Sequence, residues 1–149
     1  MKQLEFKIII DAPREVVWNI LIGIDTYPIW TSVFSENSKV ETDWKVGSKA
    51  LFLNGDGSGM VSIIEENIPY SFLSIKHIGW IKDGIEETES EEIKSWAGSH
   101  ENYTLKDLHN NTLWIVELDV TPEFESCMQE MWPKAQQKVK EMAEAANKE

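Results

Sequence analysis

IIIDAPREVVWNIL, from Ile8 to Leu21, joins an extended segment to a helix across an Ala-Pro pair. Residues 4–8 alternate between apolar and polar and an apolar run follows, which is typical of a strand. Pro13 ends this strand, because its fixed φ and its missing N–H suit the first position of a helix. Apolar side chains then recur at helical spacing from Val16 to Leu21. The strand is therefore expected to lead directly into a short helix.

A second short helix and a series of strands are expected next. The segment DTYPIW, from Asp25 to Trp30, fits a helical turn with Pro28 near its start. From residue 40 the pattern has period two, and turn-forming runs such as NGDGSG, residues 54–59, separate the apolar segments. We expect about six consecutive antiparallel strands, at residues 40–44, 49–53, 59–65, 72–80, 100–106 and 112–120. The acidic run EETESEE, residues 86–92, is expected to form a solvated strand edge or a loop.

The last third of the chain contains its longest helical pattern. Thr121, Pro122 and Glu123 have the character of a cap, a first position and an acidic first turn. Apolar residues then follow at three- and four-residue steps down to the C-terminus, and Pro133 within them predicts a kink. We therefore expect a single α+β domain over residues 1–149, in which a curved antiparallel sheet of about six to seven strands wraps this helix.

The net charge and the cysteine content of the chain indicate which kinds of partner and which cellular location to expect. The net charge is −12, from 14 Lys+Arg against 26 Asp+Glu. This charge repels phosphate backbones and anionic head groups, so neither nucleic acid nor a membrane is an expected partner. The single Cys127 cannot form an internal disulfide, and the N-terminus lacks the apolar core of a signal peptide. A cytoplasmic location is therefore expected.

The order of these elements is similar to that of the helix-grip superfamily, which includes START lipid-transfer domains, polyketide cyclases and other SRPBCC-like proteins. IIIDAPREVVWNIL and the YPIW of residues 27–30 carry the resemblance. Residues 57–77 and the closing WPKAQQKVKEMAE of residues 132–144 resemble, within that superfamily, the branch related to the activator of the heat-shock-ninety chaperone ATPase. The resemblance implies a helix-grip fold with a cavity between the sheet and the C-terminal helix. It implies no particular ligand, because one fold carries transfer proteins, enzymes and co-chaperones.

Strand parity predicts which side chains face that cavity, because polar neighbours mark the solvent face of each strand. The predicted cavity residues come from the strands, the short-helix region and the C-terminal helix. They are Trp30, Phe34, Phe52, Met60, Ile64, Leu73, Ile75, His77, Tyr103, Leu105, Trp114, Val116, Leu118, Met128, Met131, Trp132 and Ala135. Each apolar member, taken alone, is better explained as ordinary core than as a ligand contact.

His77 and Tyr103 are the polar side chains best placed to orient a ligand. A core histidine bonded to a neighbour, and an aromatic wall whose hydroxyl reaches solvent or backbone, are the structural alternatives. No catalytic residue and no cofactor is predicted. A metal site is not expected either, because His77, His100 and His109 lie on separate predicted strands and turns.

Three functions fit these patterns. The first is non-catalytic binding of a small hydrophobic or amphipathic molecule in the cavity. The second is an enzyme of the cyclase or hydratase kind, which needs a second titratable group within hydrogen-bond reach of His77. The third, implied by the resemblance alone, is a chaperone-activator-like interaction module, for which a chaperone contact or a weak homodimer would be the interaction.

Overall fold

The computed structural model describes residues 1–148 of the chain and has an α+β architecture. Its elements are β1 (Lys2–Ile10), α1 (Arg14–Ile22), α2 (Tyr27–Trp30), the 3-10 turn η1 (Thr31–Val33), β2 (Lys39–Glu41), β3 (Lys49–Leu53), β4 (Gly59–Ile68), β5 (Phe72–Lys82), β6 (Ile85–Glu87), α3 (Glu91–Lys94), β7 (His100–Leu108), β8 (Asn111–Val120) and α4 (Pro122–Asn147). The predicted sheet, the two short helices after the first strand and the long C-terminal helix are thus confirmed. Glu149, which the expected domain included, lies outside the described residues.

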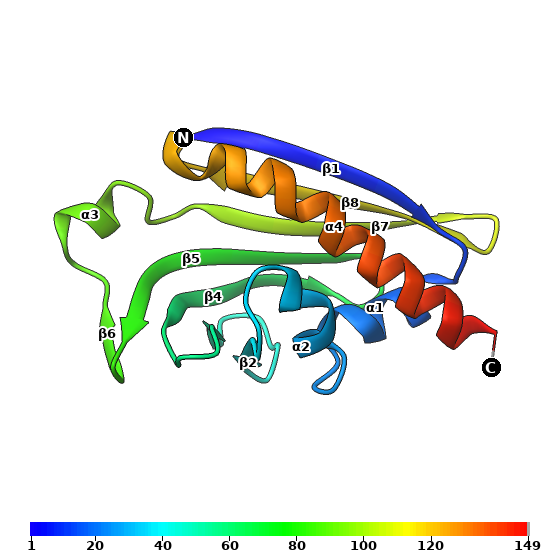
Figure 1. Cartoon of the computed structure of the whole chain (residues 1–149), viewed down its shortest axis with the longest axis horizontal. Coiled ribbons are helices and arrows are strands. Elements are labelled where there is room, and N and C mark those ends of the chain that lie inside the picture. Colours follow the sequence, from blue (N-terminus) through cyan, green and yellow to red (C-terminus); the bar gives the residue numbers. More distant parts are fainter. Residues whose placement is uncertain (149) are drawn as a thin grey trace.

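One antiparallel sheet of eight strands forms the body of the molecule (Figure 1). Its order is β1-β8-β7-β5-β4-β3-β2, and β6 pairs with β5 off this path. Helix α4 runs beside the edge strand β1 (Figure 1). Two side chains of α4 donate hydrogen bonds to backbone carbonyl groups of that strand. Gln136 Nε2 donates to the Phe6 carbonyl at 3.2 Å, and Lys140 Nζ donates to the Ile9 carbonyl at 3.0 Å. These bonds join α4 to β1.

The sheet separates into two parts beyond the middle of β5. Strands β5 and β7 pair only from Phe72 opposite Thr104 to Lys76 opposite His100. After the next residue, His77, the register between β4 and β5 shifts, so that Ile78 is an extra residue on β5. Strand β5 then continues beside β4 and β6 without β7, which begins at His100, while β8 continues beside β1. This separation leaves room between the sheet and the first half of α4.

Three local expectations require correction. The predicted strand over residues 40–44 ends at Glu41, because Trp44 has a φ of 64°, which a strand does not accommodate. Pro13 is the residue before α1 rather than its first position. The acidic run over residues 86–92, expected as a solvated strand edge or a loop, is in part such an edge, because Glu86 and Glu87 belong to β6, but Glu91 and Glu92 begin α3, which was not expected. Ser90 caps α3 by accepting from the Ile93 N–H at 3.3 Å.

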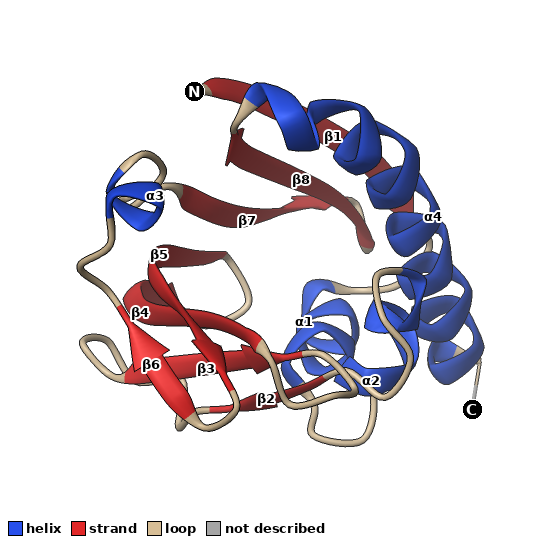
Figure 2. Ribbon diagram, turned by 60° about the vertical axis from the view of Figure 1, so that its left-hand side comes forward, coloured by secondary structure: helices blue, strands red, loops and turns tan. Residues whose placement is uncertain are grey.

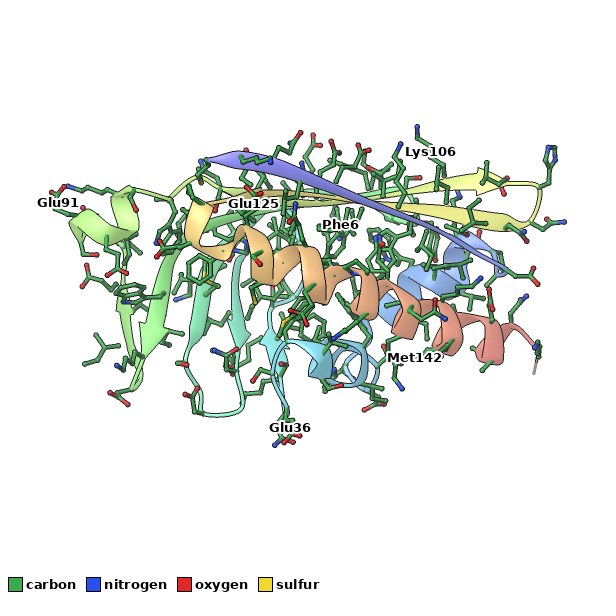
Figure 3. The ribbon with its side chains drawn as sticks, turned by 45° about the horizontal axis from the view of Figure 1, so that its top comes forward. Phe6, Glu36, Glu91, Lys106, Glu125 and Met142 are labelled. Carbon is green, nitrogen blue, oxygen red and sulfur yellow. The ribbon has the colours of Figure 1, made fainter. Side chains whose placement is uncertain are left out.

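Side-chain directions on the last two strands agree with the predicted parity. Along β8 the residues at positions 114, 116, 118 and 120 are buried, while those between them are half-buried. Figure 3 shows Lys106 on β7 pointing away from α4, as its predicted outward position requires.

Among residues 1–148, no helix combines the length and the apolar character needed to cross a bilayer.

Candidate functional site

A cavity of about 680 Å³ lies between the inner face of the sheet and the first half of α4. Figure 2 shows α4, β7, β8, β3, β4, β5 and the short helices arranged around this region. Its mouth is bordered by the ends of β5 and β8, by α3 and by the first turns of α4. The volume is in the range that small-molecule sites usually have, about 300–1,000 Å³.

About half of the predicted cavity residues line this space. They are Trp30, Phe34, Phe52, Met60, His77, Tyr103, Leu118, Met128 and Trp132. Their rings form a nearly continuous aromatic wall, in which Trp132 lies 5.1 Å from Phe34 and 6.0 Å from Trp30 between ring centroids. Tyr27, which parity did not predict, continues the wall from Trp30 at 5.5 Å to Phe52 at 6.2 Å.

The other predicted cavity residues do not line it. Ile64, Leu73, Ile75, Leu105, Trp114, Val116 and Ala135 belong instead to the fully packed core. The reason is that the inner face is divided along its length: α1 and α4 cover one end, and only the other end faces free space. Met131 is displaced for a different reason, since it lies on the flank of α4 where Cys127 Sγ approaches its sulfur at 3.9 Å.

Glu101 is a charged cavity residue that strand parity did not predict. It lies two residues before Tyr103 on β7 and therefore on the same inner face, where it pairs opposite Leu118 and Ile75. Counting the alternation back from Tyr103 would have found it. The side chain is 23% exposed and lines the cavity.

Four polar side chains join across three strands at the cavity wall. Ser62 Oγ lies 2.7 Å from His77 Nδ1, and His77 Nε2 lies 3.4 Å from Glu101 Oε1. The Tyr103 hydroxyl donates a short hydrogen bond to Glu101 Oε2. We call Ser62, His77, Glu101 and Tyr103 the polar cluster. It brings together the two polar residues predicted from the sequence, and Glu101 connects them.

The electrostatics of the wall keep its tyrosines protonated. Burial, and then the nearby charge of Glu101, raise the pKa of Tyr27 above its ordinary value. Burial raises the pKa of Tyr103 as well, with the Glu101 charge as the second cause. Both side chains therefore remain neutral phenols at physiological pH.

The polar cluster can accept, donate or move a proton, but it lacks an accessible nucleophile. Ser62 is fully buried and its hydroxyl is engaged with His77, so its role is to orient the imidazole. His77 and Glu101 do face the cavity, and together they are the pair of titratable groups that an acid–base function needs. Among residues 1–148, no group of three or more His, Cys, Asp or Glu side chains is arranged to hold a metal ion.

This combination of a curved sheet, a C-terminal helix and a cavity between them is the helix-grip fold. The structure is similar to that of the Aha1 dimer from Colwellia psychrerythraea, with a TM-score of 0.72 and 19% identity over 97% of both chains. It is also similar to protein MLL2253 from Mesorhizobium loti, with a TM-score of 0.71 and 16% identity over 95% of this chain and 96% of that one.

CalU16 from Micromonospora echinospora has the same fold, with a TM-score of 0.65 and 16% identity over 95% of this chain and 75% of that one. At these identities the similarities establish the fold alone. No protein-family model matches the sequence, and no curated protein is significantly similar to it.

Proposed function

We propose that this domain binds a small hydrophobic or amphipathic molecule in the cavity, without transforming it. The observation that carries the proposal is the cavity itself, about 680 Å³ with nine aromatic side chains and three methionines among the residues that line it. A cavity of this kind holds a ligand by removing apolar surface from water. Burying about 200 Å² of ligand surface contributes roughly 5 kcal/mol before the costs of association, which alone gives an affinity no tighter than about 0.2 mM, so a larger buried area or hydrogen bonds to the polar cluster must supply any tighter binding.

The polar cluster orients the ligand in this account. His77 and Glu101 reach the cavity from neighbouring strands, and Tyr103 lies between Glu101 and the aromatic wall. A few fixed polar groups in an apolar cavity select one orientation of an amphipathic molecule, because an unmatched buried polar group is costly. We expect this function in the cytoplasm, with neither nucleic acid nor a membrane as a partner.

Titration with N-phenyl-naphthylamine, a neutral dye whose fluorescence rises in apolar surroundings, tests binding. Met60→Trp enlarges a half-buried residue of the cavity wall, and Val46→Trp adds the same ring at a position that is 63% exposed. The dye is expected to bind the wild type and Val46→Trp equally, and Met60→Trp at least about tenfold more weakly, because overpacking excludes it. Absence of saturable binding to the wild type, or equal binding to all three proteins, would refute the proposal.

A second candidate function is proton transfer on a bound substrate, favoured by the position of Glu101 beside His77. Nitrobenzisoxazole is a neutral aromatic probe for it: a base removes the ring C–H proton while the N–O bond breaks, which gives a coloured phenolate. A base in an apolar cavity accelerates such a step. Glu101→Gln should return the rate to background, whereas Glu117→Gln on the outer face should not. Equal rates for the wild type and Glu101→Gln would remove this candidate.

A further inference from the structure

We infer that the ligand presents a hydrogen-bond donor to Glu101, as a neutral hydroxyl or amide group or as an ammonium group, and that the cavity rejects amphiphiles with an anionic end. This inference rests on the proposed binding function and names the chemical class that the same cavity takes. It follows from hydrogen bonding in the polar cluster, from the charges at the mouth and from the aromatic rings beside His77.

The hydrogen bonds of the polar cluster converge on Glu101 as their acceptor. The Tyr103 hydroxyl donates to Oε2, and His77 Nε2 lies beside Oε1. When the Ser62 hydroxyl donates to Nδ1, the imidazole proton sits on Nε2 and points at Glu101. The donors of the cluster are then already used within it. A carboxylate has about four lone-pair sites, so Glu101 can still accept from a ligand.

The field inside the cavity opposes a second negative charge. The Glu101 carboxylate, which lines the cavity, helps to raise the pKa values of Tyr27 and Tyr103, because its negative charge disfavours the formation of a phenolate beside it. A ligand carboxylate placed near these hydroxyls would meet the same repulsion. An ammonium group at that position would be attracted instead.

The charged side chains around the mouth of the cavity are mostly negative as well. Glu92, Asp119 and Glu123 line it, against Lys82 and the amino group of Met1. The whole chain adds a net charge of −12. An entrance of one sign lowers the local concentration of ligands with like charge and raises that of cations.

Aromatic rings line the cavity beside His77, the neighbour of Glu101 in the polar cluster. Phe52 lies between Tyr27, at 6.2 Å, and His77, at 6.3 Å between centroids. The faces of such rings carry negative potential, which attracts ammonium groups and repels carboxylates. The apolar wall and the carboxylate therefore suit the two ends of a neutral or cationic amphiphile.

Isothermal titration with three matched probes tests the inference. Naphthylmethylammonium, naphthylmethanol and naphthoate share one apolar body and differ in the charge of the polar end. The wild type should bind the ammonium and the alcohol at least about tenfold more tightly than the carboxylate. Glu101→Gln keeps the size of the side chain and removes the charge, so it should reduce this ratio to within about threefold. Glu117→Gln, which removes one charge from the outer face of β8, should leave the ratio unchanged.

Each outcome has a defined meaning. If the wild type binds naphthoate as tightly as the other probes, the inference is wrong while the binding function stands. If the preference persists in Glu101→Gln, the selectivity does not come from Glu101, and the inference fails in that form. If neither the three probes nor N-phenyl-naphthylamine binds, the proposed function itself is refuted. Should Glu101→Gln fail to fold, the wild-type ratio alone still decides whether anions are rejected.

Discussion

Trp132→Ala should destabilise the fold strongly, because Trp132 joins the cavity wall to the core. The side chain is 3% exposed, and its ring lies 5.1 Å from Phe34, 5.9 Å from Tyr103 and 6.2 Å from Trp114 between centroids. Truncating a buried Trp or Phe costs about 3–5 kcal/mol. Since one side of this ring faces the cavity, fewer contacts are lost, and we expect about 3 kcal/mol, from the lower part of that range.

Urea unfolding followed by far-ultraviolet circular dichroism measures this effect without relying on tryptophan fluorescence. With a slope of about 2 kcal/mol per molar urea, the midpoint should fall by about 1.5 M. Phe124→Ala is the matched control on the same helix, because Phe124 is 53% exposed, and its cost should stay below about 1 kcal/mol. A loss below about 1 kcal/mol for Trp132→Ala would show that the aromatic wall is not packed as the structure describes.

Three further predictions concern single contacts. Gln136→Ala removes the hydrogen bond to the Phe6 carbonyl and should lower the free energy of unfolding, measured in urea, by about 1–2 kcal/mol. An unchanged urea midpoint would show that this bond does not hold α4 against β1. Ser62→Ala removes the partner of His77 Nδ1, so the nitrogen-15 shifts of the His77 ring should change; identical shifts would mean that Ser62 does not set the tautomer. Burial raises the pKa of Tyr103 in the folded state, so the folded protein holds this proton more tightly than the unfolded chain, and stability should fall as the pH rises above about 10. In Tyr103→Phe the fall should be shallower, and an equal slope would contradict the assignment.

Alternation predicted the inward side of the last two strands because each has one buried face. Positions such as Trp114 and Val116 on β8 are fully buried, and the charged Glu117, the residue after Val116, faces outward. The same pattern could not separate cavity from core, because that depends on where α1 packs, and α1 meets β7 and β8 only in the folded chain. Trp114 was therefore predicted at the cavity and is found in the core.

Two features of the site could not be predicted from the alternation of apolar and polar residues. The extra residue Ile78 shifts the register of β5, which brings Trp80 into the cavity wall where strict parity would place Gly79 inward. Gly79 is itself a signal of the irregularity, since a Cβ there would lie 2.2 Å from the Glu87 carbonyl oxygen. Glu101 was missed for a different reason, because charged residues are seldom expected on an inner face.

A crystal structure of the protein soaked with N-phenyl-naphthylamine tests the central claim most directly. The account predicts electron density for the dye between Tyr27, Phe52 and Trp132, with the walls of the cavity in the positions described. If the space is instead filled by Met128 and Trp132 side chains and the dye is absent at saturating concentration, the domain is not a binding protein of the proposed kind.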